Sequence, residues 1–217
     1  MTSPLFNRRH FTASALALAA SGFAPHAHAA RQERKILVLG DSLSAEYGLP
    51  RGSGWVTLLQ KQLDQSQPGT VVVNASISGE TTSGGRTRLP ALLQQHQPSH
   101  VVIELGGNDA LRGLSLAMTA DNLEAMARAA QARGAHVLLL GMQMPPNYGA
   151  DLTRQFAALY PATARKTGAS LVPFFLKGVG DDGDPLRWFQ NDRIHPNEAA
   201  QARLLANVWP ELKKQLK

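Results

Sequence analysis

The sequence predicts an α/β protein with a layer of helices on each side of a parallel sheet, because strand-like and helix-like segments alternate along it. The strand-like segments are short and apolar throughout, which is typical of strands buried on both faces. We expect five strands, at Lys35–Leu39, Thr70–Asn74, His100–Leu105, His136–Leu140 and Leu171–Phe174. The longer segments repeat apolar residues at helical spacing, and we expect helices at Trp55–Leu63, Thr87–Gln95, Asp121–Arg133, Asp151–Lys166 and Asn197 to about Leu212. Such alternation is typical of β-α-β units with right-handed crossovers, which place helices on both faces of one sheet.

The ends of the expected helices carry signals of their own. Gly134 and Gly168 each follow a helical segment and precede a strand, where a left-handed residue commonly ends a helix. Asp121 and Glu124 have the spacing of an N-terminal cap, so we expect the third helix to begin there. No internal repeat or linker interrupts the pattern, and residues 30–217 are expected to form a single domain.

Residues 1–29 have the composition of a cleaved export signal. Arg8 and Arg9 form a basic start, an apolar stretch of small residues follows, and Ala27–Ala29 is a small-residue cleavage signal. We therefore expect cleavage after Ala29 and a periplasmic location, and the paired arginines suggest the twin-arginine route. The alternatives are a disordered or membrane-anchoring N-terminus, although the stretch is short and alanine-rich for a bilayer span.

Charge and cysteine content exclude several classes of function. Without Arg8 and Arg9 the 22 Lys+Arg fall to 20 against 16 Asp+Glu, a formal charge of +4. This excess is mild and not gathered in one block, so nucleic acid is not an expected partner. The absence of cysteine excludes disulfides, a thiol nucleophile and thiolate metal sites. No segment beyond the leader is apolar for long enough to span a membrane, and we expect a monomer that acts on small molecules.

Polar, glycine-bearing motifs follow three of the expected strands at the point where each strand ends. Gly40–Ser42 follows the first strand, Ser76–Thr81 the second and Gly106–Asp109 the third. Ligands of open parallel sheets bind outside the carboxyl ends of the strands, so these motifs should meet at one edge. Asp192–His195 lies after the fifth strand and can reach the same edge. This convergence predicts a catalytic site there.

Ser42 is the candidate nucleophile of this site. A lone serine at a strand end is more often a helix cap, but the companion motifs favour catalysis. Ser44, Ser76 and Ser78 are expected to be turn or cap residues. The chain contains no G-x-S-x-G sequence, which argues against the nucleophile elbow of the α/β-hydrolases.

His195 is the candidate base, because Asp192 precedes it by three residues. On a helical turn this spacing places both side chains on one face, so the carboxylate can accept the imidazole N–H and fix its tautomer. The alternative role for Asp192 is a cap ahead of Pro196 and Asn197.

Gly79, Asn108 and the Ser42 N–H are candidate donors to an oxyanion. Glycine lets a backbone N–H approach a substrate closely, and an asparagine amide supplies a side-chain donor. The alternative is ordinary turn chemistry, since both residue types are common in turns. Asp41 and Asp109 are expected to be structural residues that accept hydrogen bonds from loop N–H groups.

These motifs, in this order, resemble the blocks of the SGNH (GDSL) hydrolase superfamily. More narrowly, Val73–Thr81, Arg88–Leu93 and Pro146–Gly149 resemble the branch of periplasmic acyl-CoA thioesterases, lysophospholipase L1 and arylesterases. The resemblance implies a flavodoxin-like fold with a five-stranded parallel sheet of order 2-1-3-4-5. It also implies Ser42, Asp192 and His195 as catalytic residues and Ser42, Gly79 and Asn108 as the oxyanion hole, with no metal or cofactor. Arg193 departs from the family, since relatives often have glycine there, and Glu80 stands where aspartate is common.

The sequence therefore predicts a serine hydrolase of esters and thioesters of the arylesterase, acyl-CoA thioesterase or lysophospholipase type. Apolar loop residues at the same edge are candidates for an acyl groove: Leu111, Met144, Pro145 and Tyr148, with Leu114 and Met142 beside them. Met142 and Pro145 are equally consistent with simple packing roles. One alternative function is a carbohydrate O-acetyl esterase, which would need an open polar cleft. Another is a non-catalytic ligand-binding α/β module.

Overall fold

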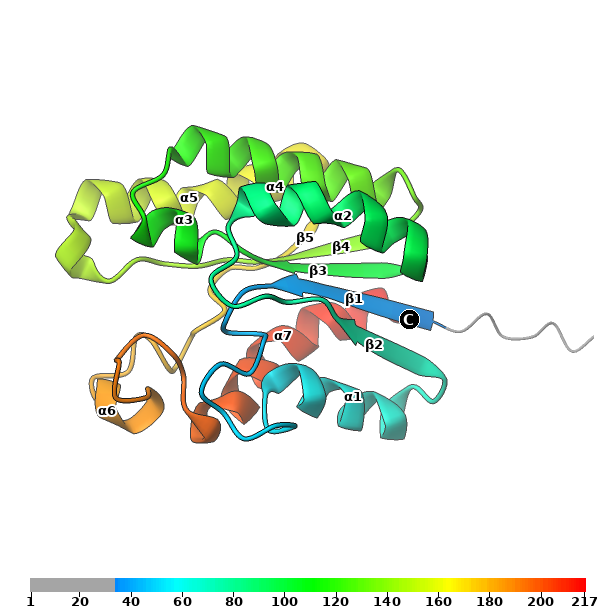
Figure 1. The fold of residues 1–217 in the computed structure, drawn as a ribbon, viewed down its shortest axis with the longest axis horizontal. Coiled ribbons are helices and arrows are strands. Elements are labelled where there is room, and N and C mark those ends of the chain that lie inside the picture. Colours follow the sequence, from blue (N-terminus) through cyan, green and yellow to red (C-terminus); the bar gives the residue numbers. More distant parts are fainter. Residues whose placement is uncertain (1–33) are drawn as a thin grey trace, which may run out of the picture. The chain divides into compact units, whose positions relative to one another are not determined.

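The described part of the chain, residues 34–217 of a computed structural model, is built around one parallel sheet (Figure 1). The predicted export signal at residues 1–29 lies outside the described residues. The five strands run in the order β2-β1-β3-β4-β5, and their bounds are β1 Arg34–Gly40, β2 Thr70–Asn74, β3 His100–Glu104, β4 His136–Leu140 and β5 Ser170–Val172. All four neighbouring pairs are parallel. The predicted α/β fold and the strand order implied by the resemblance are confirmed.

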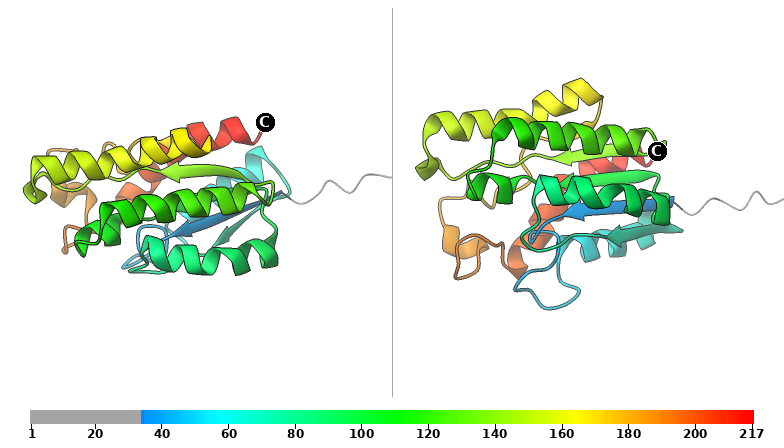
Figure 2. Two further views of the ribbon diagram at one scale, coloured as in Figure 1. Left: turned by 90° about the horizontal axis from the view of Figure 1, so that it is seen from above. Right: turned by 45° about the horizontal axis from the view of Figure 1, so that its top comes forward.

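The helices form a layer on each face of this sheet. Their bounds are α1 Trp55–Ser66, α2 Thr82–His96, α3 Gly107–Leu111, α4 Leu116–Gln131, α5 Ala150–Thr167, α6 Pro185–Trp188 and α7 Gln201–Gln215, with short 3₁₀ turns η1 Pro146–Tyr148 and η2 Glu198–Ala200. Helices α1 and α7 cover one face, while α2, α4 and α5 cover the other (Figures 1 and 2). None of the helices within residues 34–217 combines the length and apolar character that a membrane crossing requires.

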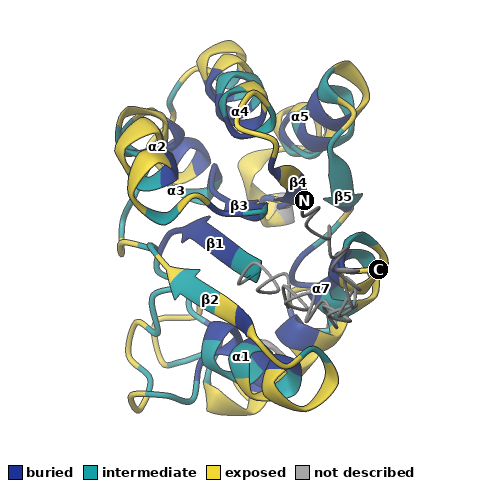
Figure 3. Cartoon of the chain, turned by 90° about the vertical axis from the view of Figure 1, so that its right-hand side faces the viewer, coloured by how far each residue is buried: buried dark blue, intermediate teal, exposed yellow. Residues whose placement is uncertain are grey.

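Burial distinguishes the central strands from the edge of the sheet (Figure 3). Strand β3 is buried along its whole length, and β1 and β4 are buried over most of theirs. Strand β2 is an edge strand, and Val71 keeps 36% of its surface exposed. The expectation of strands buried on both faces is therefore right for β1, β3 and β4 and wrong for the edge strands β2 and β5, since only Val172 of β5 is buried.

Two helices begin earlier than the sequence predicts. Helix α4 begins at Leu116, and its cap is Ser115, whose side chain accepts the Met118 N–H, so the expected cap at Asp121 is wrong. Helix α2 begins at Thr82 and not at Thr87. Asp109, far away in the sequence, accepts the Thr82 N–H at 2.8 Å and also the Thr82 hydroxyl. The cap residue itself is local, because the Thr81 hydroxyl accepts the Gly84 N–H at 3.3 Å, and Asp109 adds contacts from a distant loop.

Strand β5 and the shortest helices also differ from the prediction. Strand β5 ends at Val172 instead of Phe174, because Pro173 has no N–H to continue the ladder. Helices α3 and α6 have five and four residues, too few for a periodic apolar pattern. The two predicted glycine ends are confirmed, since Gly134 and Gly168 have φ of +80° and +72°.

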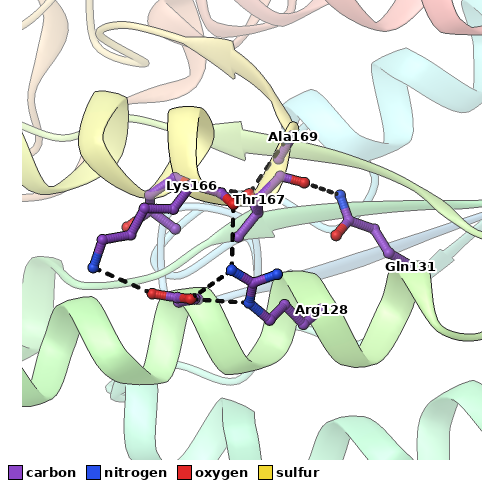
Figure 4. Close-up of polar contacts among 7 residues, drawn as sticks. Arg128, Gln131, Lys166, Thr167 and Ala169 are labelled. Carbon is purple, nitrogen blue, oxygen red and sulfur yellow. Dashed lines mark hydrogen bonds and ion pairs between the residues drawn. The ribbon is translucent and has the colours of Figure 1, made fainter.

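Helices α4 and α5 are joined by polar contacts at their C-terminal ends (Figure 4). Arg128 and Gln131 of α4 donate to the carbonyl oxygens of Lys166 and Thr167 at 3.3 and 2.9 Å. Lys166 also reaches Glu124 at 3.4 Å. These contacts satisfy carbonyl groups that the end of α5 leaves without helical partners.

Gly106, which joins β3 to α3, allows us to predict a large loss of stability. Its φ is +119°, and a Cβ there would lie 2.5 Å from the hydroxyl of Tyr160. That hydroxyl is buried and donates to the Leu105 carbonyl, so it cannot move away freely. We expect Gly106→Ala to lower the free energy of unfolding by about 2–4 kcal/mol, measured by denaturant titration.

Gly134→Ala is the matched control for Gly106→Ala. Its φ is also positive, but a Cβ at Gly134 would have no neighbour within 4 Å. Gly134→Ala should therefore lower the free energy of unfolding by only about 1–2 kcal/mol. Equal losses for the two variants would contradict a steric role for Tyr160.

Candidate active site

Ser42 lies in the turn that directly follows β1, at the carboxyl edge of the sheet. Asp41 organises this turn, because its Oδ1 accepts the Leu43 N–H at 3.0 Å and its carbonyl accepts the Ala45 N–H at 2.9 Å. Ser42 itself is half-buried. The turn therefore holds a serine at the sheet edge and leaves it partly open to solvent.

The loops after β2 and β3 meet the Ser42 turn at this edge. The Ile77 N–H donates to the Gly40 carbonyl at 3.1 Å, which ties the loop carrying Gly79 to the end of β1. Asn108 lies in the first turn of α3, directly after β3. Since β1 and β3 are neighbours whose connections leave in opposite directions, this is the switch point where open α/β sheets bind ligands.

A chain of hydrogen bonds joins Ser42, His195 and Asp192. The Nε2 atom of His195 lies 2.9 Å from Ser42 Oγ, and its Nδ1 lies 2.6 Å from Asp192 Oδ2. With the Nδ1 proton held by the carboxylate, Nε2 is an acceptor for the serine hydroxyl proton. The structure thus brings together the three residues that the sequence singled out.

The segment from Asp192 to His195 is a turn and not the helical turn that the sequence predicted. Asp192 Oδ1 accepts the N–H groups of Ile194 and His195 at 2.9 and 3.0 Å, which leaves Oδ2 for the imidazole. Arg193 takes a left-handed conformation, with φ of +59°. An aspartate-centred turn therefore positions the pair, and the i, i+3 spacing serves it as well as a helix would.

Asp192 is held as a carboxylate by these same contacts. Partial burial opposes ionisation, but the His195 N–H, the His195 side chain and the Ile194 N–H together lower the pKa of Asp192 to about 2. The carboxylate therefore stays charged over the whole range in which the imidazole can act as a base.

Tyr47 is a neighbour of His195 that the sequence analysis did not identify. The two rings lie 4.3 Å apart between centroids with a tilt of 38°. Gln190 connects the same segments, because its side chain donates to the Tyr47 carbonyl at 2.8 Å. Tyr47 thus covers one side of the imidazole, and its only signal in the sequence is its closeness to Ser42.

The candidate oxyanion donors are fixed by two further contacts. Asn108 Nδ2 donates to Asp41 Oδ2 at 3.0 Å. The Arg112 side chain, at the end of α3, donates to the Gly79 carbonyl at 2.8 Å. Gly79 has φ of +79°, a conformation that glycine adopts without strain. Asp41 therefore does more than the loop role expected of it, and Arg112 was not anticipated.

The candidate groove residues divide by burial. Leu111 and Tyr148 keep 46% and 40% of their surfaces exposed, and Pro145 is also exposed. Met142 and Met144 are 6% exposed and belong to the hydrophobic core. Burial favours packing roles for the two methionines and leaves the exposed residues as candidates for substrate contact.

Arg193 is strained in its turn, and replacing it should stabilise the protein. A non-glycine residue in the left-handed region costs roughly 1 kcal/mol relative to glycine, partly offset by the greater entropy of glycine in the unfolded chain. We expect Arg193→Gly to raise the free energy of unfolding by up to about 1 kcal/mol, measured by denaturant titration.

Arg165→Gly is the matched control for Arg193→Gly. Arg165 is an exposed arginine within α5, where glycine should cost about 1 kcal/mol. The two variants should change stability in opposite directions, and a loss of stability in both would contradict strain at Arg193.

The chain is similar to known proteins of one hydrolase family. A model of the GDSL-like Lipase/Acylhydrolase family matches residues 38–203. Esterase TesA of Pseudomonas aeruginosa is 54% identical over 178 residues, which cover 82% of this chain and 87% of the relative. Thioesterase 1/protease 1/lysophospholipase L1 of Escherichia coli K12 is 45% identical over 166 residues, which cover 76% of this chain and 77% of the relative.

The chain also has the same fold as a solved structure. The crystal structure of a protein named TesA superimposes with a TM-score of 0.80 at 53% identity and covers 84% of this chain and 99% of its own. The family match spans both the Ser42 turn and the Asp192–His195 turn. The chain therefore belongs to the GDSL-like lipase/acylhydrolase family, as its motifs predicted.

Proposed function

We propose that this protein hydrolyses carboxylic esters and thioesters through an acyl-enzyme formed on Ser42. The observation that carries the proposal is the unbroken hydrogen-bond chain from Ser42 Oγ through His195 to Asp192. Membership of an acylhydrolase family supports it, as do relatives named as an esterase and as a thioesterase and lysophospholipase.

The first half of the reaction forms the acyl-enzyme. His195 Nε2 takes the proton of the Ser42 hydroxyl while Oγ attacks the carbonyl carbon of the substrate. Asp192 stabilises the resulting imidazolium without taking its proton. The imidazolium then protonates the leaving alcohol or thiol as the bond from the carbonyl carbon to it breaks.

Three donors would stabilise the negative oxygen of the tetrahedral intermediate. These are the backbone N–H groups of Ser42 and Gly79 and the side-chain amide of Asn108. Donors that are already oriented cost no reorganisation during the reaction, and the loss of one lowers the rate by about 10²–10³-fold.

The second half of the reaction releases the acid. His195 activates a water molecule, which attacks the acyl carbon on Ser42, and the proton returns to Ser42 Oγ as the ester bond breaks. Both halves use the same base and the same oxyanion donors. The reaction consumes only water and needs no cofactor in this scheme.

We infer that Leu111 and Tyr148 contact the acyl chain of the substrate, with Pro145 beside them. They are exposed side chains in the segments that follow β3 and β4 at the carboxyl edge of the sheet. We expect Leu111→Ser to lower kcat/KM for an octanoyl nitrophenyl ester by on the order of tenfold, with little effect on the acetyl ester. Val71→Ser, an equivalent change of an exposed residue on β2, is the control that should change neither.

The substrate class is tested with a panel that includes the alternatives. We expect the purified protein to hydrolyse nitrophenyl esters, acyl-CoA and lysophospholipid, and to act weakly on acetylated xylan. Activity on acetylated xylan alone would favour the carbohydrate esterase. Binding of these compounds without any turnover would favour a non-catalytic module.

The same proposal includes export and a monomeric state. The basic, apolar and small-residue pattern of residues 1–29 supports export to the periplasm. N-terminal sequencing of protein recovered from a periplasmic fraction should begin at Ala30. Recovery of the full-length chain from the cytoplasm would contradict export, and light scattering of the mature protein tests the monomer.

A further inference from the structure

Glu104, the last residue of β3, is a carboxyl group enclosed within the protein beside the Ser42 turn. It has no exposed surface, and its Oε2 accepts the Asp41 N–H at 3.2 Å and the Ser44 hydroxyl at 2.8 Å. Gly40 is its register partner on β1, and a Cβ at Gly40 would lie 2.8 Å from Oε2. The first glycine of the Gly40–Ser42 motif therefore leaves room for this carboxyl. Charged residues are rarely buried without a role, and the mechanism above does not use Glu104.

Asp41 connects Glu104 to the oxyanion site. Only 2% of Asp41 is exposed, and its carboxyl is hydrogen-bonded to that of Glu104. Its Oδ1 accepts the Leu43 N–H, and its Oδ2 accepts Asn108 Nδ2. A continuous polar path therefore runs from the end of β3 through Asp41 to the Asn108 amide.

A single proton shared by the two carboxyls explains the hydrogen-bond partners that surround them. As a carboxylate, Glu104 Oε1 has no donor among the described residues, whereas as a protonated acid it can donate to Asp41. Burial first, and then the negative charge of Asp41, raise the pKa of Glu104 well above its usual value. Burial also raises the pKa of Asp41, to about 6, although the Leu43 N–H, Asn108, Glu104 and the positive charge of His195 each lower it.

Tyr160 is a further titratable group near this pair, and its pKa responds to both carboxyls and to Asp109. Burial, followed by the negative charges of Glu104, Asp41 and Asp109, raises the pKa of Tyr160 well above its usual value, so its hydroxyl stays neutral. The Asp109 carboxylate accepts hydrogen bonds from the N–H and hydroxyl of Thr82 and from the hydroxyl of Thr119. Above pH about 6 these shifts therefore favour one proton on Glu104 and one negative charge on Asp41.

We propose that Glu104 and Asp41 form a one-proton carboxyl pair that orients the side-chain amide of Asn108 as an oxyanion donor. This inference rests on the proposed function of Asn108. An ionised Asp41 accepts hydrogen bonds only, so Asn108 must turn its NH₂ group toward it. One N–H of that group binds Asp41, and the second stays free for the oxyanion. Both carboxyls are positioning residues, because they act through Asn108.

Asp41→Asn tests the orientation directly. The Leu43 N–H holds an oxygen at the Oδ1 position, so the new NH₂ group faces Asn108 and turns the Asn108 oxygen toward it. The oxyanion site then loses its side-chain donor. We expect kcat to fall by about 10²-fold with KM within about threefold. In an Asn108→Ala background, Asp41→Asn should lower kcat by less than about threefold, because the Asn108 donor is already absent.

Glu104→Gln and Glu104→Leu test the proton. Glutamine supplies the same accepting oxygen and a permanent donor toward Asp41, so kcat should stay within about threefold of wild type. Leucine removes the accepting oxygen and the donor toward Asp41, so kcat should fall by about tenfold or more. The infrared spectrum of the folded wild-type protein at pH 8 should contain a protonated carboxyl band that Glu104→Gln lacks. A second band should grow as the pH falls through about 6 and be absent in Asp41→Asn.

Asp109→Asn is the matched control, since it alters a buried aspartate that contacts Thr82 and Thr119 instead of Asn108. It should lower the melting temperature and leave both carboxyl bands in place. If Asp41→Asn lowers kcat by the same factor with and without Asn108→Ala, the proposal is overturned. Equal kcat for Glu104→Gln and Glu104→Leu would also overturn it. Absence of the protonated band at pH 8 would overturn it even if a variant fails to fold. Absence of wild-type ester turnover would instead refute the proposed function, and the infrared result would still stand.

Discussion

Ser42→Ala should abolish turnover of a nitrophenyl ester, with kcat falling by about 10⁴-fold or more. Among residues 34–217, Ser42 Oγ is hydrogen-bonded only to His195 Nε2, at 2.9 Å. Removing the hydroxyl therefore removes the nucleophile and disturbs little else. We expect the melting temperature to change only slightly, and residual activity to come from the oxyanion donors and the binding of substrate.

Ser78→Ala is the control for this variant, because Ser78 is an exposed serine in a loop at the same edge of the sheet. It should keep wild-type kcat and KM. If Ser42→Ala hydrolyses the ester at the wild-type rate while remaining folded, Ser42 is not the nucleophile. If both variants lose activity equally, the loss is a general effect on the edge of the sheet.

Asp192→Asn should lower kcat by about 10⁴-fold, nearly as much as loss of the nucleophile. Two backbone N–H groups hold an oxygen at the Oδ1 position of residue 192, so the new NH₂ group must face His195 Nδ1. That group donates to Nδ1 and forces the imidazole proton onto Nε2. His195 then presents a proton to Ser42 Oγ where it should present a lone pair, and it cannot act as a base.

The pH dependence of stability gives a second measurement on the same variant. The pKa of Asp192 is lowered to about 2, so its contacts stabilise the folded state above pH about 4 and are lost as the pH falls toward 2. Any stability advantage of wild type over Asp192→Asn should therefore shrink over that range. Asp121→Asn, an exposed aspartate on α4, should show neither the loss of kcat nor this pH effect. Wild-type kcat in a folded Asp192→Asn protein would contradict its role in fixing the tautomer.

The central strands were predictable because their sequence pattern reports directly on burial. Strands β2 and β4 have the predicted bounds, β1 is one residue longer at each end, and β3 ends one residue earlier. What the pattern could not tell is which strand lies at an edge, since the apolar run of β2 resembles those of β1 and β3. That distinction depends on strand order, which came from the resemblance.

The starts of α2 and α4 were predicted five residues too late, because the residues that cap them, Thr81 and Ser115, were not identified as caps. The Asp121–Glu124 pair has the spacing of a cap, yet the cap of α4 is Ser115, six residues before Asp121. The start of α2 depends on Asp109, which becomes a neighbour only in the folded chain. Local spacing therefore predicted the existence of these helices better than their first residues.

The residues that meet at the candidate site were predictable because each follows a strand or stands in a short, chemically distinctive motif. The geometry between Asp192 and His195 was only half predictable, since the i, i+3 spacing suggested a helix and the structure has an aspartate-centred turn. Glu104 was passed over although an acid within the predicted strand His100–Leu105 is itself unusual. Its partners, Asp41 and Ser44, were expected to have only local roles in the turn, and the sequence does not show that a distant carboxyl contacts them.

The identity of the nucleophile is tested most directly by stoichiometric labelling with a fluorophosphonate, followed by peptide mass spectrometry. We expect one phosphonyl group per chain, bound to Ser42, and a loss of esterase activity in proportion to labelling. Ser42→Ala should not be labelled, and Asp192→Asn should be labelled far more slowly. Loss of activity with the label on another residue, or full activity with Ser42 labelled, would contradict an acyl-enzyme on Ser42.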